Sequence, residues 1–89
     1  MSNYLEYQSY YNLIIKSMEK IAKEEFSGNT RLLSVNIDLI GQDKDYILGD
    51  LETITDVEKK SKDTLFLKTS VLANNKIITY SSAIWAKGN

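Results

Sequence analysis

The segment YLEYQSYYNLIIKSMEKIAKEEF, residues 4–26, decides the fold of this chain. Its apolar residues recur every three or four positions, which is the period that places side chains on one face of an α-helix. The apolar stripe comprises Tyr4, Tyr7, Tyr11, Ile14, Met18, Ile21 and Ala22, and it is widened by Tyr10, Ile15 and Phe26. A stripe this wide needs a broad apolar partner, so we predict a long helix that lies across a sheet.

Short polar signals mark both ends of the predicted helix. Asn3 is suited to cap the first turn, because its side-chain oxygen can accept a hydrogen bond from a free backbone amide. Glu6 has the spacing of the returning partner in a capping box. After Phe26, we expect Gly28 to take the left-handed conformation that closes the helix.

Beyond residue 30 the apolar period becomes alternating, which is typical of strands with one buried face. Strands are predicted over residues 33–39, 46–57, 64–73 and 76–86, with a solvated charged turn over residues 58–63. The alternation turns Leu33 and Ile77 inward, and Trp85 is expected to anchor the last strand. Asn74 and Asn75 form a two-residue hairpin turn, because Asn tolerates positive φ. One helix followed by antiparallel strands predicts an α+β fold, with the helix packed on one face of a four-stranded sheet.

The second face of the last two predicted strands is not fully polar. If the helix covers only one face, five large apolar side chains stay exposed, namely Phe66, Leu72, Ile78, Tyr80 and Ile84. Exposed apolar area on this scale usually marks an interface. We therefore predict a homodimer or a higher homo-oligomer.

The composition limits the classes of function. The 89 residues are 43% hydrophobic and 26% charged, which predicts one small globular domain over residues 1–89. A net charge of −1 argues against nucleic acid as a partner. The chain has no Cys and no His, which rules out thiolate chemistry and a Ser-His-Asp triad, and we expect no metal and no cofactor. Since no long apolar run or leader pattern occurs, we expect a cytoplasmic protein that does not engage a membrane.

Several motifs resemble a known family. Residues 3–7, Asn-Tyr-Leu-Glu-Tyr, are similar to the helix start of hotdog-fold thioesterases of the 4-hydroxybenzoyl-CoA type. Residues 46–51, Tyr-Ile-Leu-Gly-Asp-Leu, resemble the family's second-strand signature, and the hairpin from Thr64 to Trp85 resembles its final paired strands. The resemblance covers nearly the whole chain. It implies a hotdog-like fold that acts on acyl-CoA thioesters at the seam of a dimer.

The chain also departs from the family pattern. The family normally places another strand and a catalytic loop, often Asp-x-x-Gly-His-Val-Asn, before the helix, and the Asp and His of that loop have no counterpart here. Many members also carry a Glu two residues after the second Tyr of the helix motif, where this chain has Ser9. The departures imply either a shortened, inactive relative or a fragment whose first strand is absent.

The resemblance implies a thioester carbonyl near the helix N-terminus, where free amides and the helix dipole stabilise a developing oxyanion. Glu6 is the carboxylate nearest to that end and is the candidate general base, although we prefer a capping role in partnership with Asn3. Asn3, Tyr4 and Tyr7 are the candidate substrate-binding residues. Core packing is the simpler explanation for the tyrosines.

Other polar residues also have structural explanations that we prefer to functional ones. Asp38 lies on the polar side of its strand, and Asp50, which follows Gly49, suits a turn or a bulge. Three lysines could contact the phosphates of coenzyme A, but a mixed-charge turn is normally a solvated loop. These are Lys59, Lys60 and Lys62.

Two functions stay open at this point. The first is an acyl-CoA thioesterase-like protein that hydrolyses or binds a thioester at a dimer seam. The second is a non-catalytic hotdog or cystatin-like module that oligomerises or binds a protein partner. The absence of the family's acid and base leaves the two close to even.

Overall fold

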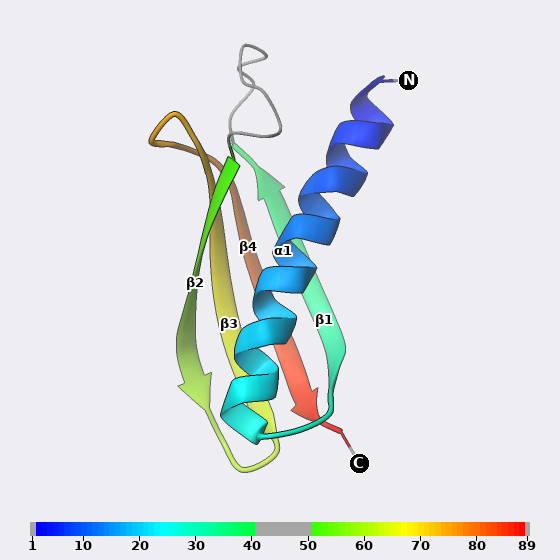
Figure 1. Ribbon diagram of the computed structural model, residues 1–89, viewed down its shortest axis with the longest axis vertical. Coiled ribbons are helices and arrows are strands. Elements are labelled where there is room, and N and C mark those ends of the chain that lie inside the picture. Colours follow the sequence, from blue (N-terminus) through cyan, green and yellow to red (C-terminus); the bar gives the residue numbers. More distant parts are fainter. Residues whose placement is uncertain (1, 41–50, 89) are drawn as a thin grey trace.

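The computed structural model describes residues 2–40 and 51–88, with side chains from Tyr10 onward. The elements are α1 (Ser2–Phe26), β1 (Thr30–Leu39), β2 (Leu51–Lys60), β3 (Thr64–Ala73) and β4 (Lys76–Lys87). The strands form one antiparallel sheet in the order β1-β4-β3-β2, and α1 crosses one face of it obliquely (Figure 1). The predicted α+β architecture, with one long helix on a four-stranded antiparallel sheet, is confirmed.

The core lies between α1 and the inner face of the sheet, which is the face that the helix covers. The helix contributes Tyr10, Ile14, Met18 and Ala22, which are all buried. Residues four apart stack on one side of a helix, so this row points at the sheet. We expected Tyr11 within the stripe, but it is 40% exposed. One residue turns the helix by about 100°, which carries Tyr11 away from the row that starts at Tyr10.

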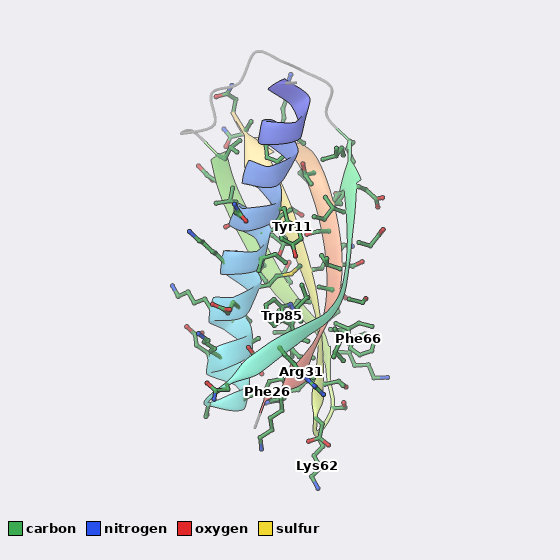
Figure 2. All side chains as sticks on the ribbon, turned by 90° about the vertical axis from the view of Figure 1, so that its right-hand side faces the viewer. Tyr11, Phe26, Arg31, Lys62, Phe66 and Trp85 are labelled. Atoms are coloured by element: carbon green, nitrogen blue, oxygen red, sulfur yellow. The ribbon has the colours of Figure 1, made fainter. Side chains whose placement is uncertain are left out.

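The central strands β3 and β4 supply the other half of the core. Leu65, Leu67 and Val71 are buried on β3, and Ala83 and Trp85 are buried on β4. Trp85 lies between the helix and the strands (Figure 2). Its predicted role as an anchor of the last strand is confirmed.

The helix ends at Phe26 as predicted, but its start and the residue that closes it differ from the prediction. The helix begins at Ser2, so Asn3 lies in its first turn rather than before it. At the other end Ser27, not Gly28, takes positive φ, with a value of 55°. The Gly28 N–H donates to the Lys23 carbonyl at 3.2 Å, which is the bond of a Schellman closure. The expectation for Gly28 was wrong because the left-handed position directly follows Phe26.

Two bulges correct the predicted strand faces. An irregularity between Leu32 and Ser34 in β1 turns Leu33 outward, where it is 51% exposed. In β4 the pairing with β3 skips Ile78, which is buried, and leaves Ile77 39% exposed. The outward positions of Leu33 and Ile77 are the reverse of the prediction, which turned both side chains inward. A bulge inserts one extra residue into a strand, so the alternation shifts by one position beyond it.

The second strand extends three residues further toward the C-terminus than predicted, to Lys60. Residues 46–50, which include Gly49 and Asp50, lie outside the described residues. Residues 58–60, predicted as part of a turn, continue β2 beyond a bulge between Val57 and Lys59. The Lys60 ammonium lies 3.4 Å from the Glu25 carboxylate and donates to the Glu25 carbonyl at 2.9 Å. This contact ties the extension of β2 to the end of α1.

The hairpin between β3 and β4 agrees with the prediction. Asn74 and Asn75 have φ values of 51° and 67°, which matches a two-residue type I′ turn. The turn pairs Ala73 with Lys76 at the start of β4. The strand itself continues one residue further than predicted, to Lys87.

Candidate functional site

An open groove runs along one flank of α1, between the helix and the edge strand β2. Because the row from Tyr10 to Ala22 faces the middle of the sheet, a flanking row of helix residues stands over its edge. The volume of the groove is about 530 Å³. The lining residues are Leu13, Lys16, Ser17, Lys20, Ile21, Glu24, Thr53 and Thr55.

A row of hydroxyl groups extends from the groove into the core. Ser17 Oγ shares a hydrogen bond of 2.6 Å with Thr55 Oγ1, which shares another of 2.8 Å with Thr69 Oγ1. Ser81 Oγ donates to the Thr69 carbonyl at 3.0 Å. The row therefore joins α1, β2, β3 and β4 at one level of the sheet.

This hydroxyl row was not predicted from the sequence. Thr55, Thr69 and Ser81 occupy inward positions on three neighbouring strands, and the pairing register aligns them. Ser17 lies among apolar residues on the helix. Polar residues at core positions are unfavourable unless they are paired or functional, so this coincidence was the available signal.

The chemistry open to the row is binding rather than proton transfer. A serine nucleophile needs a base within hydrogen-bond distance, and the Ser17 hydroxyl shares its bond with the hydroxyl of Thr55. Among the described residues, the buried polar side chains are Thr69, Thr79 and Ser81, with no carboxylate or amine. The hydroxyls can position a carbonyl or an amide of a ligand, but they supply no general base.

The rim of the groove is electropositive. Lys16 and Lys20 line it, and neither forms an ion pair with a carboxylate of the described part of the chain. Lys23, one turn further on, pairs with Glu19 at 3.5 Å. Glu24 contributes a single negative charge to the lining. Two lysines against one carboxylate favour a ligand that carries negative charge.

The residues predicted for the thioester site all lie in the first two turns of α1. The side chains of Asn3, Tyr4, Glu6 and Tyr7 fall outside the described part of the structure, so their roles stay predictions. The rise of an α-helix places Glu6 roughly 15 Å from Lys16 along the axis.

The three lysines considered for phosphate binding do not come together. Lys59 pairs with the outward Phe66 and Lys60 with the inward Leu65, so these neighbours point to opposite faces. Lys60 is engaged by Glu25, and its Nζ lies 5.7 Å from the centre of the Phe26 ring. Lys62 projects from the tip of the β2–β3 turn (Figure 2).

Two further properties bear on the class of site. Within the described residues, no three His, Cys, Asp or Glu side chains gather into a group that could hold a metal ion. In the same part of the chain, no helix has both the length and the apolar character needed to cross a bilayer.

The fold is similar to several solved structures. A gentisyl-coenzyme A thioesterase superposes with a TM-score of 0.75 at 10% identity, over 93% of this chain and 73% of that one. A hypothetical protein from Aquifex aeolicus superposes with a TM-score of 0.69 at 11% identity, over 93% of this chain and 80% of that protein. A thioesterase from Thermus thermophilus, complexed with coenzyme A and zinc, superposes with a TM-score of 0.62 at 14% identity, over 88% of this chain and 65% of that protein. This chain thus spans less than two thirds of the Thermus enzyme.

These similarities define the architecture. No family model and no curated protein matches the sequence. At identities this low, the structural likeness establishes the fold alone, and that fold is the hotdog-like α+β arrangement that the sequence resemblance implied. Specificity for 4-hydroxybenzoyl-CoA stays a prediction.

Proposed function

We propose that this chain binds an acyl thioester of the coenzyme A class along the flank of α1 and hydrolyses it at the N-terminal end of that helix, at a seam between two copies. The groove between α1 and β2 is the observation that carries the proposal. Its volume of about 530 Å³ lies within the range of small-molecule sites. Two of the similar solved structures are thioesterases, which supports the same class of ligand.

The lining of the groove suits the long arm and the phosphates of such a ligand. Leu13 and Ile21 offer apolar contact, and the hydroxyl of Thr53 offers hydrogen bonds to amides. Lys16 and Lys20 stand where phosphates would gain from positive charge. The extended arm of coenzyme A would then carry the thioester toward the start of the helix.

In this proposal, the start of α1 supplies the chemistry. The first backbone amides of a helix are free to donate, and together with the helix dipole they stabilise a carbonyl oxygen that gains negative charge. The Glu6 carboxylate takes a proton from water, the oxygen attacks the thioester carbon, and the carbon–sulfur bond breaks to release the thiolate. Asn3, Tyr4 and Tyr7 would contact the acyl end.

A second candidate function is binding without turnover. The observation that favours it is the absence of His and Cys from the sequence, together with the lack of any buried carboxylate among the described residues. Enzymes commonly tune such a group for proton transfer by burying it. A non-catalytic module would use the same groove for binding or would present its sheet to a partner.

Binding can be measured separately from hydrolysis. Calorimetry with coenzyme A should detect binding, and the double substitution Lys16→Ala/Lys20→Ala should weaken it by about tenfold or more. Lys23→Ala is the matched control, because Lys23 is on the same helix but pairs with Glu19. The absence of binding to the unchanged chain would refute the proposed function.

Hydrolysis is tested by release of free thiol from 4-hydroxybenzoyl-CoA, gentisyl-CoA and straight-chain acyl-CoA. Glu6→Gln should abolish turnover and preserve binding, because the amide keeps the size of the side chain but is no longer a base. Glu19→Gln, on the exposed side of α1, is the control. Binding with no turnover by the unchanged chain would support the non-catalytic alternative.

A further inference from the structure

The strand β2 lies at an edge of the sheet, and its open side borders the groove. In the part of the chain that the structure describes, β2 pairs with β3 alone (Figure 1). An edge strand presents the N–H and C=O groups of alternate residues to its open side, where another extended chain can pair with them. From Leu51 to Val57 the register of β2 is regular, and its bulge lies beyond Val57. This segment is therefore a continuous template for one more strand.

A strand added to β2 would turn every second side chain into the groove. Neighbouring strands lie about 4.8 Å apart and share their faces, so side chains opposite Thr53 and Thr55 would enter beneath the flank of α1. Leu13 and Ile21 offer apolar contact there. The Thr55 hydroxyl already shares a hydrogen bond of 2.6 Å with Ser17. Apolar β-branched side chains therefore suit the inward positions of the added strand.

The outward side chains of β2 select the charge of the added strand. Ile54 is 51% exposed and lies between the outward carboxylates Glu52 and Asp56. Lys68 is the cross-strand neighbour of Asp56, but its ammonium pairs with Glu58 at 4.0 Å. Directly opposed residues stabilise a sheet when their charges are opposite or when both are apolar. A fitting strand places basic side chains against the two carboxylates and an apolar one against Ile54.

The same charges oppose the pairing of β2 with β2 of a second copy. In an antiparallel pairing centred on Ile54, Glu52 of each copy would stand opposite Asp56 of the other. Like charges directly opposite one another destabilise a sheet. Charge on an edge strand thus disfavours association of copies and still admits a strand of opposite charge.

The other edge of the sheet offers a weaker template. Beyond the bulge in β1, the outward side chains are Ser34, Asn36 and Asp38, with one carboxylate instead of two and no apolar residue between charges. The inward residues Val35 and Ile37 pack against the core. The groove and the paired carboxylates therefore distinguish the edge of β2.

We propose that the edge of β2 binds an extended segment of another polypeptide as an added strand, with apolar β-branched residues in the groove and basic residues on the outer face of the sheet. Main-chain hydrogen bonds to β2 supply affinity, and the alternate side chains supply specificity. Because the added strand fills the groove, it competes with the coenzyme A ligand of the proposed function. The inference does not depend on that ligand, since strand addition needs only the edge and the groove.

Calorimetry with the capped peptide Ser-Lys-Val-Ile-Val-Lys-Ser tests the added strand. In either direction its lysines stand opposite Glu52 and Asp56 and its valines opposite Thr53 and Thr55. We expect binding, and binding weaker by about tenfold or more for Ser-Glu-Val-Ile-Val-Glu-Ser.

Methylation of the peptide nitrogens tests the main-chain pairing. One peptide carries methyl groups on the lysine and isoleucine nitrogens, and another carries them on the valine nitrogens. Only one of them should lose binding, because alternate amides of a strand point to opposite sides. No binding of the unmodified lysine peptide, or the same effect of both methylations, would overturn the inference.

A charge exchange on the protein tests the predicted position of the strand. Glu52→Lys/Asp56→Lys should weaken binding of the lysine peptide by about tenfold or more and strengthen binding of the glutamate peptide. Asp38→Lys is the matched control, because it reverses an outward carboxylate on the other edge strand. All three residues are exposed, so circular dichroism should show the same fold throughout. An equal effect of Asp38→Lys would contradict binding at β2.

Coenzyme A separates this inference from the proposed function. If both ligands bind the unchanged chain, each should raise the apparent dissociation constant of the other, and binding without competition would overturn the inference. Coenzyme A binding by a chain that does not bind the peptide would overturn the inference alone. Peptide binding by a chain that does not bind coenzyme A would refute only the proposed function. Glu52→Lys/Asp56→Lys should retain coenzyme A binding, because both side chains lie outside the groove.

Discussion

Leu67 and Phe66 are neighbours in β3, yet Leu67 is 1% exposed beneath α1 and Phe66 is 39% exposed on the opposite face. Both faces of the central strands carry large apolar side chains. The inner face is closed by the helix, and the outer face has no cover from any described element. Hydrophobicity along a strand therefore does not distinguish the core of this protein from its exposed surface. The position of α1 makes that distinction.

The two faces of the sheet also carry different kinds of polar side chain. On the inner face the polar residues are hydroxyls, and Thr55 and Thr69 satisfy one another through a hydrogen bond. On the outer face they include charges such as Asp56 and Lys68, which stand side by side in the register. A buried hydroxyl needs one or two partners, whereas a buried charge needs far more compensation. This difference in cost explains why, among the described residues, the buried part of the inner face carries hydroxyls and no charged side chain.

Trp85→Ala should have the largest effect on stability. Removing a buried indole from the inner face leaves a cavity, and we expect the free energy of unfolding to fall by about 3–5 kcal/mol. Phe66→Ala on the outer face should cost about 1 kcal/mol or less. Urea unfolding, followed at protein concentrations low enough to keep the chain unassociated, measures both. Equal losses would mean that the two faces are equally covered in solution.

Thr55→Val should have an intermediate effect. It keeps the shape of the side chain but leaves the buried Thr69 hydroxyl without its bond, at a cost of about 1–3 kcal/mol in unfolding free energy. Adding Thr69→Val should recover part of the loss, because the Thr69 hydroxyl that had lost its hydrogen-bond partner is then removed as well. Ser82→Ala on the outer face is the control, with a change within about 0.5 kcal/mol. A double variant that loses the sum of both single effects would argue against the hydroxyl row.

The adjacent residues Lys60 and Lys59 offer the smallest and most local comparison. Lys60 joins β2 to the end of α1 through Glu25, so Lys60→Ala should cost about 0.5–1 kcal/mol in unfolding free energy. Lys59→Ala should leave the stability of the unassociated chain unchanged. Thermal unfolding of the two variants at matched concentration is the measurement. A greater loss for Lys59→Ala would contradict the assignment of these residues to opposite faces.

Much of the fold could be predicted from local patterns. The helical period, the alternation in β3 and the Asn74–Asn75 turn are properties of neighbouring residues, and all three agree with the structure. The errors at Leu33 and Ile77 arose at bulges, where one inserted residue shifts the alternation. Bulge positions depend on the pairing between strands, so no single strand reveals them.

The candidate site was less accessible to sequence analysis. Its groove depends on the flank of α1 that stands over β2, and this follows from how the helix crosses the sheet. The alignment of Ser17 with Thr55 joins residues 38 positions apart. Glu6 and its neighbours were selected by resemblance, and their roles remain predictions for the thioester assay.

The sequence by itself determined the elements of this protein and the kind of chemistry available to it. The periodicity of residues 4–26 specifies an amphipathic helix because backbone geometry fixes which residues share a face. The 89 residues contain no His and no Cys, so none of these residues can serve as a histidine base or a cysteine nucleophile. Only the tertiary structure decided which apolar face is covered and which hydroxyls meet, since both depend on the docking of α1 across strands that are distant in sequence. For that reason, the helix that decides the fold also separates the groove on one side of the sheet from the exposed apolar side chains on the other.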